Sequence, residues 1–210
     1  MTADAAFWDG IAETYARKPV NDPDAFERKI AITRARIPPR AAVLDIGCGT
    51  GSLALRLAPG AGHVHGLDLS SEMIRIANGK AAAQGTGNVT FHTGPFDDSF
   101  TAFGDASLDV ICAYSLLHLV EDRPAVLARI YRLLKPGGVF VSSTACLGES
   151  WAPYTPMLRV MRWLGKAPMV KSFSKRTLED EIRRTGFVDL AAPDVGTKPT
   201  IAFLVAVRPR

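Results

Sequence analysis

The stretch AAVLDIGCGTGSLALRL, residues 41–57, places three glycines directly after a short apolar run. The run at 41–47 has the length of a buried strand, and residues 52–58 have the apolar spacing of a helix. The glycines therefore fall in a turn between strand and helix, where backbone amides can approach a ligand at the helix N-terminus. This stretch predicts an α/β fold with a ligand-binding loop after its first strand.

The spacing of the glycines restricts the kind of ligand. Gly47, Gly49 and Gly51 form a G-x-G-x-G pattern, whereas dinucleotide-binding loops have G-x-G-x-x-G, and no Gly-Lys-Ser/Thr sequence follows as in a P-loop. Asp45, two residues before the first glycine, would repel a pyrophosphate and would suit an ammonium group. The loop therefore favours a ligand that is cationic at one end and carries no phosphate.

A second acid, Asp68, lies near the end of the next predicted strand, residues 63–69. A carboxylate at this position can accept hydrogen bonds from both hydroxyls of a ribose. Together with the loop and Asp45, it indicates a nucleoside that bears a cationic amino acid. S-adenosylmethionine meets this description.

Strands and helices alternate along the chain, which predicts a doubly wound α/β fold with a seven-stranded, mostly parallel sheet and helices on both faces. The last two strands have no helix between them, so the last strand is expected to be antiparallel. The expected helices are 5–16, 24–36, 52–58, 71–84, 123–134 and 174–184, and the expected strands are 41–47, 63–69, 88–94, 108–114, 139–145, 187–192 and 200–207. A Pro136-Gly137-Gly138 turn is expected before the fifth strand.

The chain is predicted to form one domain. It would comprise an N-terminal helical lid (1–38), a cofactor-binding core (39–145), a helical cap inserted after the fifth strand (146–173), and a C-terminal helix with edge strands (174–210).

Taken together, these motifs resemble those of small, single-domain class I S-adenosylmethionine-dependent methyltransferases that act on small molecules. VLDIGCGTG (43–51) resembles the first motif of the family and GLDLSSEMIRIA (66–77) the second. SLDVICAYSLLHLVED (107–122) resembles the fourth-strand region, and LLKPGGVFV (133–141) the turn into the fifth strand. AETYA (12–16) resembles an N-terminal segment that closes over the cofactor in many relatives.

The resemblance implies a role for each matched residue, with S-adenosylmethionine as cofactor and S-adenosylhomocysteine as product. Asp45 would contact water or the methionine amino group, Asp68 the ribose hydroxyls, and Tyr15 the methionine carboxylate. Leu69 and Met73 would pack on the adenine. The remaining implied contacts come from the glycine loop, the adenine end and the sulfonium end: Gly47, Cys48, Gly49, Thr50, Gly51, Pro95, Phe96, Tyr114 and Ser115.

One position departs from the family pattern. After the third strand, relatives commonly carry Gly-Asp, whose Asp accepts a hydrogen bond from the adenine amino group. This chain has Pro95 at that position, and proline offers neither a side-chain acceptor nor an amide N–H. Three replacements are open: Asp97, Asp98 or the backbone amide of Phe96.

A catalytic base is needed only if the acceptor must lose a proton, since methyl transfer from a sulfonium depends mainly on in-line positioning in a water-poor site. His118, just past the fourth predicted strand, is the candidate for such a base because imidazole titrates near neutral pH. The alternative is that His118 caps the following turn or lines the pocket.

Composition limits the partners. From residue 151 onward there are 11 Lys and Arg against 5 Asp and Glu, so the basic excess of the chain lies in its C-terminal part. The three cysteines have no C-x-x-C pairing, and no His, Asp and Glu grouping predicts a metal site. No signal peptide or apolar span of ~20 residues is visible, which predicts a cytoplasmic protein. Nothing in the sequence indicates an oligomeric state.

The acceptor is expected to be a small molecule. The Asn/Asp-Pro-Pro-Tyr/Phe motif of enzymes that methylate amide or base nitrogens is replaced by Cys112-Ala113-Tyr114-Ser115, and no added RNA-binding module is visible, so nucleic acid is disfavoured. Specificity is expected from the N-terminal helices and from 146–173, whose Met, Trp and Tyr content favours an apolar or aromatic acceptor. The candidate pocket residues there are Trp151, Tyr154, Met157 and Trp163.

Residues 151–170 also allow a second interpretation. Arg159, Arg162 and Lys166 share one helical face, and apolar side chains lie largely on another. The segment is either a cap helix over the pocket or an amphipathic helix that contacts an anionic membrane or a lipid-like acceptor. For the whole chain, the alternatives are a methyltransferase for RNA or protein, and a non-catalytic S-adenosylmethionine-binding protein, for which Pro95 is the hint.

Overall fold

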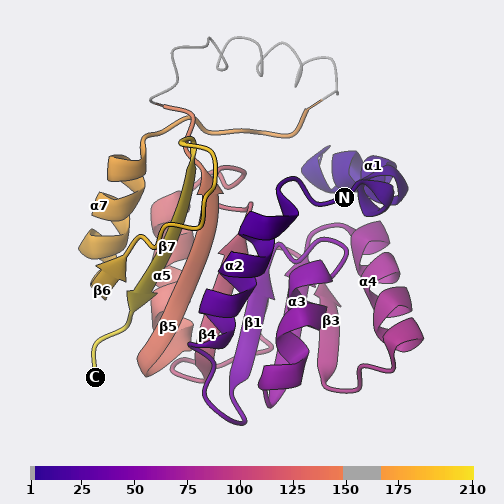
Figure 1. The fold of residues 1–210 in the computed structure, drawn as a ribbon, viewed down its shortest axis with the longest axis horizontal. Coiled ribbons are helices and arrows are strands. Elements are labelled where there is room, and N and C mark those ends of the chain that lie inside the picture. The colour runs from indigo at the N-terminus through magenta and orange to yellow at the C-terminus, as the bar shows by residue number, and fades with distance from the viewer. Residues whose placement is uncertain (1–2, 149–166) are drawn as a thin grey trace.

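The computed structural model describes residues 3–148 and 167–210, and its centre is a seven-stranded sheet in the order β3-β2-β1-β4-β5-β7-β6 (Figure 1). Strands β1 to β5 pair in parallel, whereas β7 pairs antiparallel with both β5 and β6. The predicted mostly parallel sheet with an antiparallel last strand is therefore confirmed. The strands are β1 (Ala42–Ile46), β2 (His63–Asp68), β3 (Val89–Thr93), β4 (Leu108–Tyr114), β5 (Leu134–Ala145), β6 (Val188–Ala191) and β7 (Ile201–Val207).

Helices cover both faces of this sheet, as predicted (Figure 1). On one face, α2 and α3 pack on the apolar side chains of the central strands, and α4 packs on β2 and β3. On the other face, α5 and α7 bury leucines and isoleucines against β4, β5 and β7. The helices are α1 (Ala3–Arg17), α2 (Pro23–Arg34), α3 (Ser52–Leu57), α4 (Ser71–Gln84), α5 (Arg123–Leu133) and α7 (Lys175–Thr185), and a 3-10 turn η1 (Ala58–Gly60) follows α3.

Strand β1 shows why the sheet is buried on both sides. Val43 belongs to the core under α2 and α3, whereas Leu44 and Ile46 belong to the core under α5, because successive side chains of a strand point to opposite faces. All three are almost inaccessible to solvent. A continuous apolar run is therefore required here, as in other parallel strands covered on both faces.

Short polar caps fix where several helices begin. Asp22, Ser70, Asp122 and Ser174 each accept, through a side-chain oxygen, the amide three residues further on, and so start α2, α4, α5 and α7. Helix α4 ends at Gly85, which takes the left-handed conformation that favours glycine.

Strand β5 starts earlier than expected. Leu134 already pairs with Leu108, and a register shift follows before Val110 pairs with Val139. The Gly137 amide donates to the Arg208 carbonyl, and the Arg208 amide donates to the Gly138 carbonyl. The Pro-Gly-Gly segment is therefore an irregularity inside the strand, stabilised by the chain that follows β7, and not a turn that precedes it.

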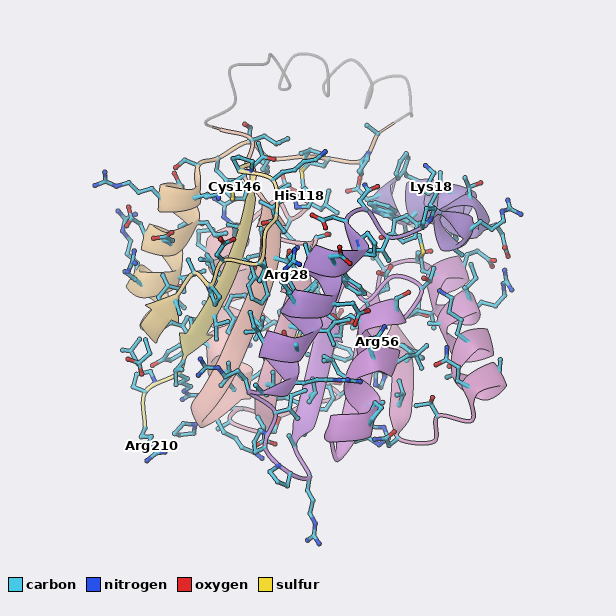
Figure 2. All side chains as sticks on the ribbon, viewed as in Figure 1. Lys18, Arg28, Arg56, His118, Cys146 and Arg210 are labelled. Carbon is cyan, nitrogen blue, oxygen red and sulfur yellow. The ribbon has the colours of Figure 1, made fainter. Side chains whose placement is uncertain are left out.

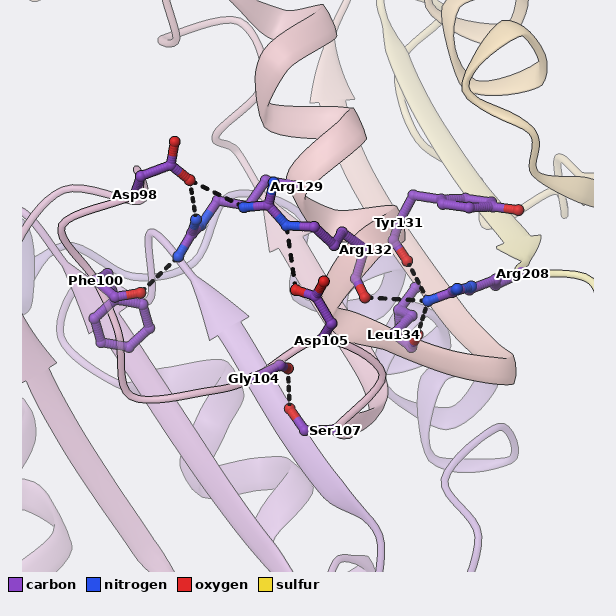
Figure 3. A network of polar contacts seen from close by, with 10 residues as sticks. All are labelled: Asp98, Phe100, Gly104, Asp105, Ser107, Arg129, Tyr131, Arg132, Leu134 and Arg208. Atoms are coloured by element: carbon purple, nitrogen blue, oxygen red, sulfur yellow. Dashed lines mark hydrogen bonds and ion pairs between the residues drawn. The ribbon is translucent and has the colours of Figure 1, made fainter.

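The chain between β3 and β4, residues 94–107, forms no helix and is tied to α5 by ion pairs (Figure 3). Asp98 accepts from Arg129 at 2.6 Å and from Arg132 at 2.9 Å, and Arg129 also donates to the Phe100 carbonyl. At the end of α5, Arg208 donates to the carbonyls of Tyr131, Arg132 and Leu134. Such a cation satisfies carbonyls that the helix end leaves unpaired.

Within the described ranges, no helix is both long enough and apolar enough to cross a membrane.

A substitution at Gly51 tests the packing at the start of α3, and a substitution at Gly79 in α4 serves as its control. Gly51 has φ +76°, and a Cβ there would lie 2.7 Å from Phe91 Cζ and 2.9 Å from Ala77 Cβ. Gly79, inside α4, would place a Cβ in space free of described atoms within 4 Å. We expect Gly51→Ala to lower the free energy of unfolding by about 2 kcal/mol or more, and Gly79→Ala to raise it by up to ~1 kcal/mol.

Urea denaturation of both variants measures these changes. Equal effects of the two substitutions would contradict the packing role assigned to Gly51.

Candidate active site

A cavity of about 530 Å³ opens at the carboxyl ends of the parallel strands. Its walls include the ends of β1 and β2 and the residues that follow β3 and β4. The chain runs from β1 outward to β3 and then returns to β4 on the other side of β1, so the cavity lies at the topological switch point of the sheet. This is where open α/β sheets bind ligands.

Most of the predicted site residues line this cavity. They come from α1, from the loops after β1, β2, β3 and β4, and from the start of α4: Tyr15, Gly47, Gly49, Asp68, Leu69, Met73, Pro95, Phe96, Tyr114, Ser115 and His118. Among the described residues that form the lining, four predicted ones are missing: Asp45, Cys48, Thr50 and Gly51.

The glycine loop leaves an open cradle at Gly49. Its φ is +53°, and a Cβ built there would meet, within 4 Å among the described atoms, Tyr15 Cε1 at 3.9 Å. The amides of Gly47 and Cys48 both donate to the Leu67 carbonyl at the end of β2. The loop is thus held to the neighbouring strand while Gly49 leaves room for a ligand beside its backbone.

Asp68 joins the loop to the next helix. Its Oδ2 accepts from the Gly49 amide at 2.8 Å, and its Oδ1 accepts from the Ser70 amide at 2.9 Å. Burial raises the pKa of Asp68, and these hydrogen bonds act in the opposite direction. The carboxylate therefore presents its remaining acceptor capacity to the cavity from a fixed position.

The four predicted residues that do not line the cavity are buried or contact neighbouring elements of the fold. Asp45 is 1% exposed, and the Cys48 side chain is also buried. Thr50 accepts from Lys80 Nζ at 2.7 Å, and Gly51 lies against α4 and β3. Since none of the four lines the cavity among the described residues, their contacts with the cofactor stay predictions.

Asp45 is a buried acid without full hydrogen bonding. Its Oδ2 has no partner in the part of the chain that the structure describes. Burial, with a smaller contribution from the Asp68 charge, raises the pKa of Asp45 to about 8. At neutral pH this carboxyl is therefore largely protonated.

Tyr114 and Ser115 end β4 at the cavity. The Tyr114 hydroxyl lies 2.8 Å from Thr33 Oγ1 of α2, so this side chain ties α2 to the sheet. Ser115 has φ +54°, a conformation that is costly for a side-chain-bearing residue, and its amide donates to the Ser143 carbonyl at 2.7 Å. Strained backbone of this kind is common at ligand sites.

The structure separates the three possible replacements for the missing adenine acid. Asp97 accepts hydrogen bonds from the amide and the hydroxyl of Ser99. Asp98 forms ion pairs with Arg129 and Arg132 of α5 (Figure 3). Phe96 lines the cavity together with Pro95. Of the three candidate residues, Phe96 is the one in the cavity lining, as far as the described residues go.

His118 lies at the same end of the molecule as the cavity (Figure 2). Its carbonyl accepts from the Lys171 amide, and its Nδ1 is buried without a partner among the described residues. Burial lowers the pKa of His118 to about 4, so the imidazole is neutral at pH 7.

Sequence reasoning missed the apolar part of the wall. It consists of side chains from the turn after β4, from α5 and from the end of the predicted cap: Leu116, Leu119, Val120, Val126, Pro168, Met169 and Val170. Asp4 and Trp8 of α1 were also missed. Apolar residues that line a pocket have the same pattern as core residues, so the sequence carried no separate signal for them.

Of the two helices in the predicted lid, α1 lines the cavity, whereas α2 packs on the sheet. The cap residues predicted at 151, 154, 157 and 163, and the basic face at 159, 162 and 166, lie outside the described residues.

A family model described as a methyltransferase domain matches residues 38–181. The ubiquinone/menaquinone biosynthesis C-methyltransferase UbiE of Geotalea daltonii is 34% identical over 115 residues, which are 53% of this chain and 48% of that protein. The nocamycin O-methyltransferase of Saccharothrix syringae is 41% identical over 108 residues, 49% of this chain and 38% of that protein. The chain thus spans about half or less of the length of these curated relatives.

Solved structures share the fold. Phosphoethanolamine N-methyltransferase 2 of Haemonchus contortus, in complex with phosphomonomethylethanolamine and S-adenosylhomocysteine, superposes with a TM-score of 0.72 at 20% identity. The match covers 88% of this chain and 53% of that chain.

The buried Asp45 carboxyl makes a prediction for the pH dependence of stability. Because its pKa is 3.8 in the unfolded chain and about 8 in the folded protein, its contribution is complete below about pH 4 and is lost as the pH rises through 8. We expect Asp45→Asn, which cannot ionise, to lose less stability than the wild type between pH 6 and pH 9.

The free energy of unfolding in urea at three pH values across this range measures the effect. Parallel pH profiles for the two proteins would show that Asp45 does not titrate in this window.

Proposed function

Because the chain belongs to the methyltransferase-domain family, we propose that it is an enzyme that transfers a methyl group from S-adenosylmethionine to a small, apolar or aromatic acceptor. The family match and the fold confirm the family predicted from the glycine loop and support S-adenosylmethionine as the cofactor. The observation that carries the proposal is the pairing of an open glycine cradle with Asp68 in one cavity.

The residues present fit this cofactor. Gly49 leaves space beside the loop backbone, Asp68 offers a carboxylate for ribose hydroxyls, and Tyr15 of α1 lies on the other side of the loop. Leu69 and Met73 line the same cavity, where they would offer an apolar surface to adenine. When bound, S-adenosylmethionine supplies an electrophilic methyl group on a positively charged sulfonium.

The apolar part of the cavity wall favours an apolar acceptor. It is built from Leu116, Leu119 and Val120 after β4, Val126 of α5 and the segment 168–170. Apolar walls exclude water and favour the burial of an aromatic or aliphatic surface, while a small number of polar groups fix the orientation. This arrangement positions an acceptor for in-line attack without covalent chemistry by the protein.

We assign the role of general base to His118. A neutral imidazole can accept a proton from a hydroxyl or amine of the acceptor, and the low pKa keeps it neutral across the physiological range. His118 lines the cavity, while its Nδ1 is buried. Bases whose pKa is near the operating pH contribute about 10²–10⁴-fold to the rate. A pKa of about 4 makes this imidazole a weaker base, so its contribution is expected at the lower end of that range.

The relatives include both a C-methyltransferase and an O-methyltransferase. The experiment therefore uses several acceptors: reduced naphthoquinone for carbon, simple phenols for oxygen, and bulk RNA for the alternative substrate class. Methylation of the small aromatics supports the proposal. Methylation of RNA alone, or binding of S-adenosylhomocysteine without turnover of any acceptor, would favour the other two functions.

Asp68→Ala tests the cofactor site directly. We expect the affinity for S-adenosylmethionine in calorimetry to fall at least about ten-fold, because each charge-assisted hydrogen bond to the carboxylate is worth ~1.5–3 kcal/mol. Asp105→Ala removes an exposed carboxylate that does not line the cavity, so it serves as the matched control and should bind as the wild type does. An unchanged affinity of Asp68→Ala would mean that the ribose lies elsewhere.

The state of His118 can be measured without knowing the acceptor. We expect its ring proton signals, assigned in NMR spectra by comparison with His118→Gln, to titrate near pH 4. With an identified acceptor, His118→Gln should lower kcat by about 10²-fold and leave cofactor affinity unchanged. A midpoint near the ordinary value for histidine would contradict the buried, neutral imidazole.

A further inference from the structure

Helix α1 contributes three side chains to the cavity wall, and a fourth side chain contacts the start of helix α4. Asp4, Trp8 and Tyr15 line the cavity, and the helix packs against α4 (Figure 1). Asp9 instead meets the start of α4. Its Oδ1 accepts from the Ser70 hydroxyl at 2.6 Å and from the Glu72 amide at 3.1 Å.

Ser70 connects the Asp9 contact to the candidate cofactor site. Its hydroxyl donates to Asp9 and accepts from the Met73 amide, which makes it the N-cap of α4. Its backbone amide donates to Asp68 Oδ1, and the other oxygen of Asp68 accepts from the Gly49 amide. Ser70 itself is fully buried. A continuous chain of hydrogen bonds therefore runs from α1 to the glycine loop.

The helix dipole of α4 favours the two carboxylates at its N-terminus. Asp9 and Asp68 both accept amides at the N-terminus of α4, where the helix dipole favours negative charge. The hydrogen bonds from Ser70 and Glu72 lower the pKa of Asp9, so this carboxylate stays ionised. An ionised acceptor makes a stronger hydrogen bond to the serine hydroxyl than a neutral one.

We propose that Asp9 is a positioning residue for cofactor binding, which acts through Ser70 to couple the seating of α1 over the cavity to the orientation of Asp68. The inference rests on the proposed function, because it takes Asp68 and Tyr15 as cofactor contacts. While Asp9 holds the Ser70 hydroxyl, Trp8 and Tyr15 stay at the cavity wall. When the contact breaks, α1 loses one of its polar contacts with the start of α4, and Ser70 loses an acceptor; the exposed Glu13–Arg75 ion pair between the two helices remains.

The first test compares three variants by calorimetry with S-adenosylhomocysteine. We expect Asp9→Ala to bind about ten-fold more weakly than the wild type, the loss associated with one hydrogen bond to a charged group. Asp9→Asn keeps an acceptor oxygen and should recover part of the affinity. Glu13→Ala breaks the exposed ion pair between α1 and Arg75 of α4 without touching Ser70, and it should bind as the wild type does if the effect of Asp9 passes through Ser70.

The second test is a double-mutant cycle with Ser70→Ala. If Asp9 acts through Ser70, the double variant binds S-adenosylhomocysteine no more weakly than Ser70→Ala alone. Amide hydrogen exchange of α1 in the complex should also be faster in Asp9→Ala, while exchange in α7 is unchanged. General destabilisation would not confine the change to α1.

Wild-type affinity in Asp9→Ala, or fully additive losses in the cycle, would overturn the coupling while leaving the proposed function intact. Absence of any S-adenosylhomocysteine binding by the wild type would overturn the proposed function, and this inference with it.

Discussion

The carboxylate of Asp68 holds together the parts of the molecule that form the cavity. One oxygen accepts the Gly49 amide from the loop after β1, and the other accepts the Ser70 amide at the start of α4. Strands β1 and β2 are neighbours in the sheet, so the loops that follow them emerge side by side. A single acidic side chain at the end of β2 can therefore set the position of both, and the glycine cradle depends on it.

This constraint has an electrostatic cost, because it brings two carboxyl groups close together in a poorly solvated region. Burial raises the pKa of both Asp45 and Asp68, and Asp45 is the more deeply buried of the two. The deeper group, Asp45, responds by staying protonated at neutral pH, which removes a buried charge without moving the chain. Asp68 is less deeply buried, and the amides of Ser70 and Gly49 act against the rise in its pKa.

The parts of the fold and site that the sequence predicted are those set by local pattern. The apolar run of β1 and the glycines after it each act within a few residues, so their consequences could be inferred from spacing alone. The early start of β5 could not, because it depends on hydrogen bonds between Gly137, Gly138 and Arg208 at the far end of the chain. The burial of Asp45 depends on the tertiary fold, although the alternation of β1 fixes which face its side chain points to. The contact between Asp9 and Ser70 spans 61 residues and has no sequence signature.

The same distinction explains why the cofactor is easier to infer than the acceptor. The cofactor end of the cavity is made by consecutive residues in two loops, where a glycine needs a left-handed backbone and an acid needs two amides. The apolar end, which we propose for the acceptor, is made by side chains from the turn after β4, from α5 and from the segment 168–170, which only the tertiary fold brings together. An apolar wall can be rebuilt by many substitutions of similar volume, whereas the glycine cradle and its acid tolerate few. Different acceptors can therefore be accommodated on one cofactor-binding frame, as the C- and O-methyltransferases among the relatives illustrate.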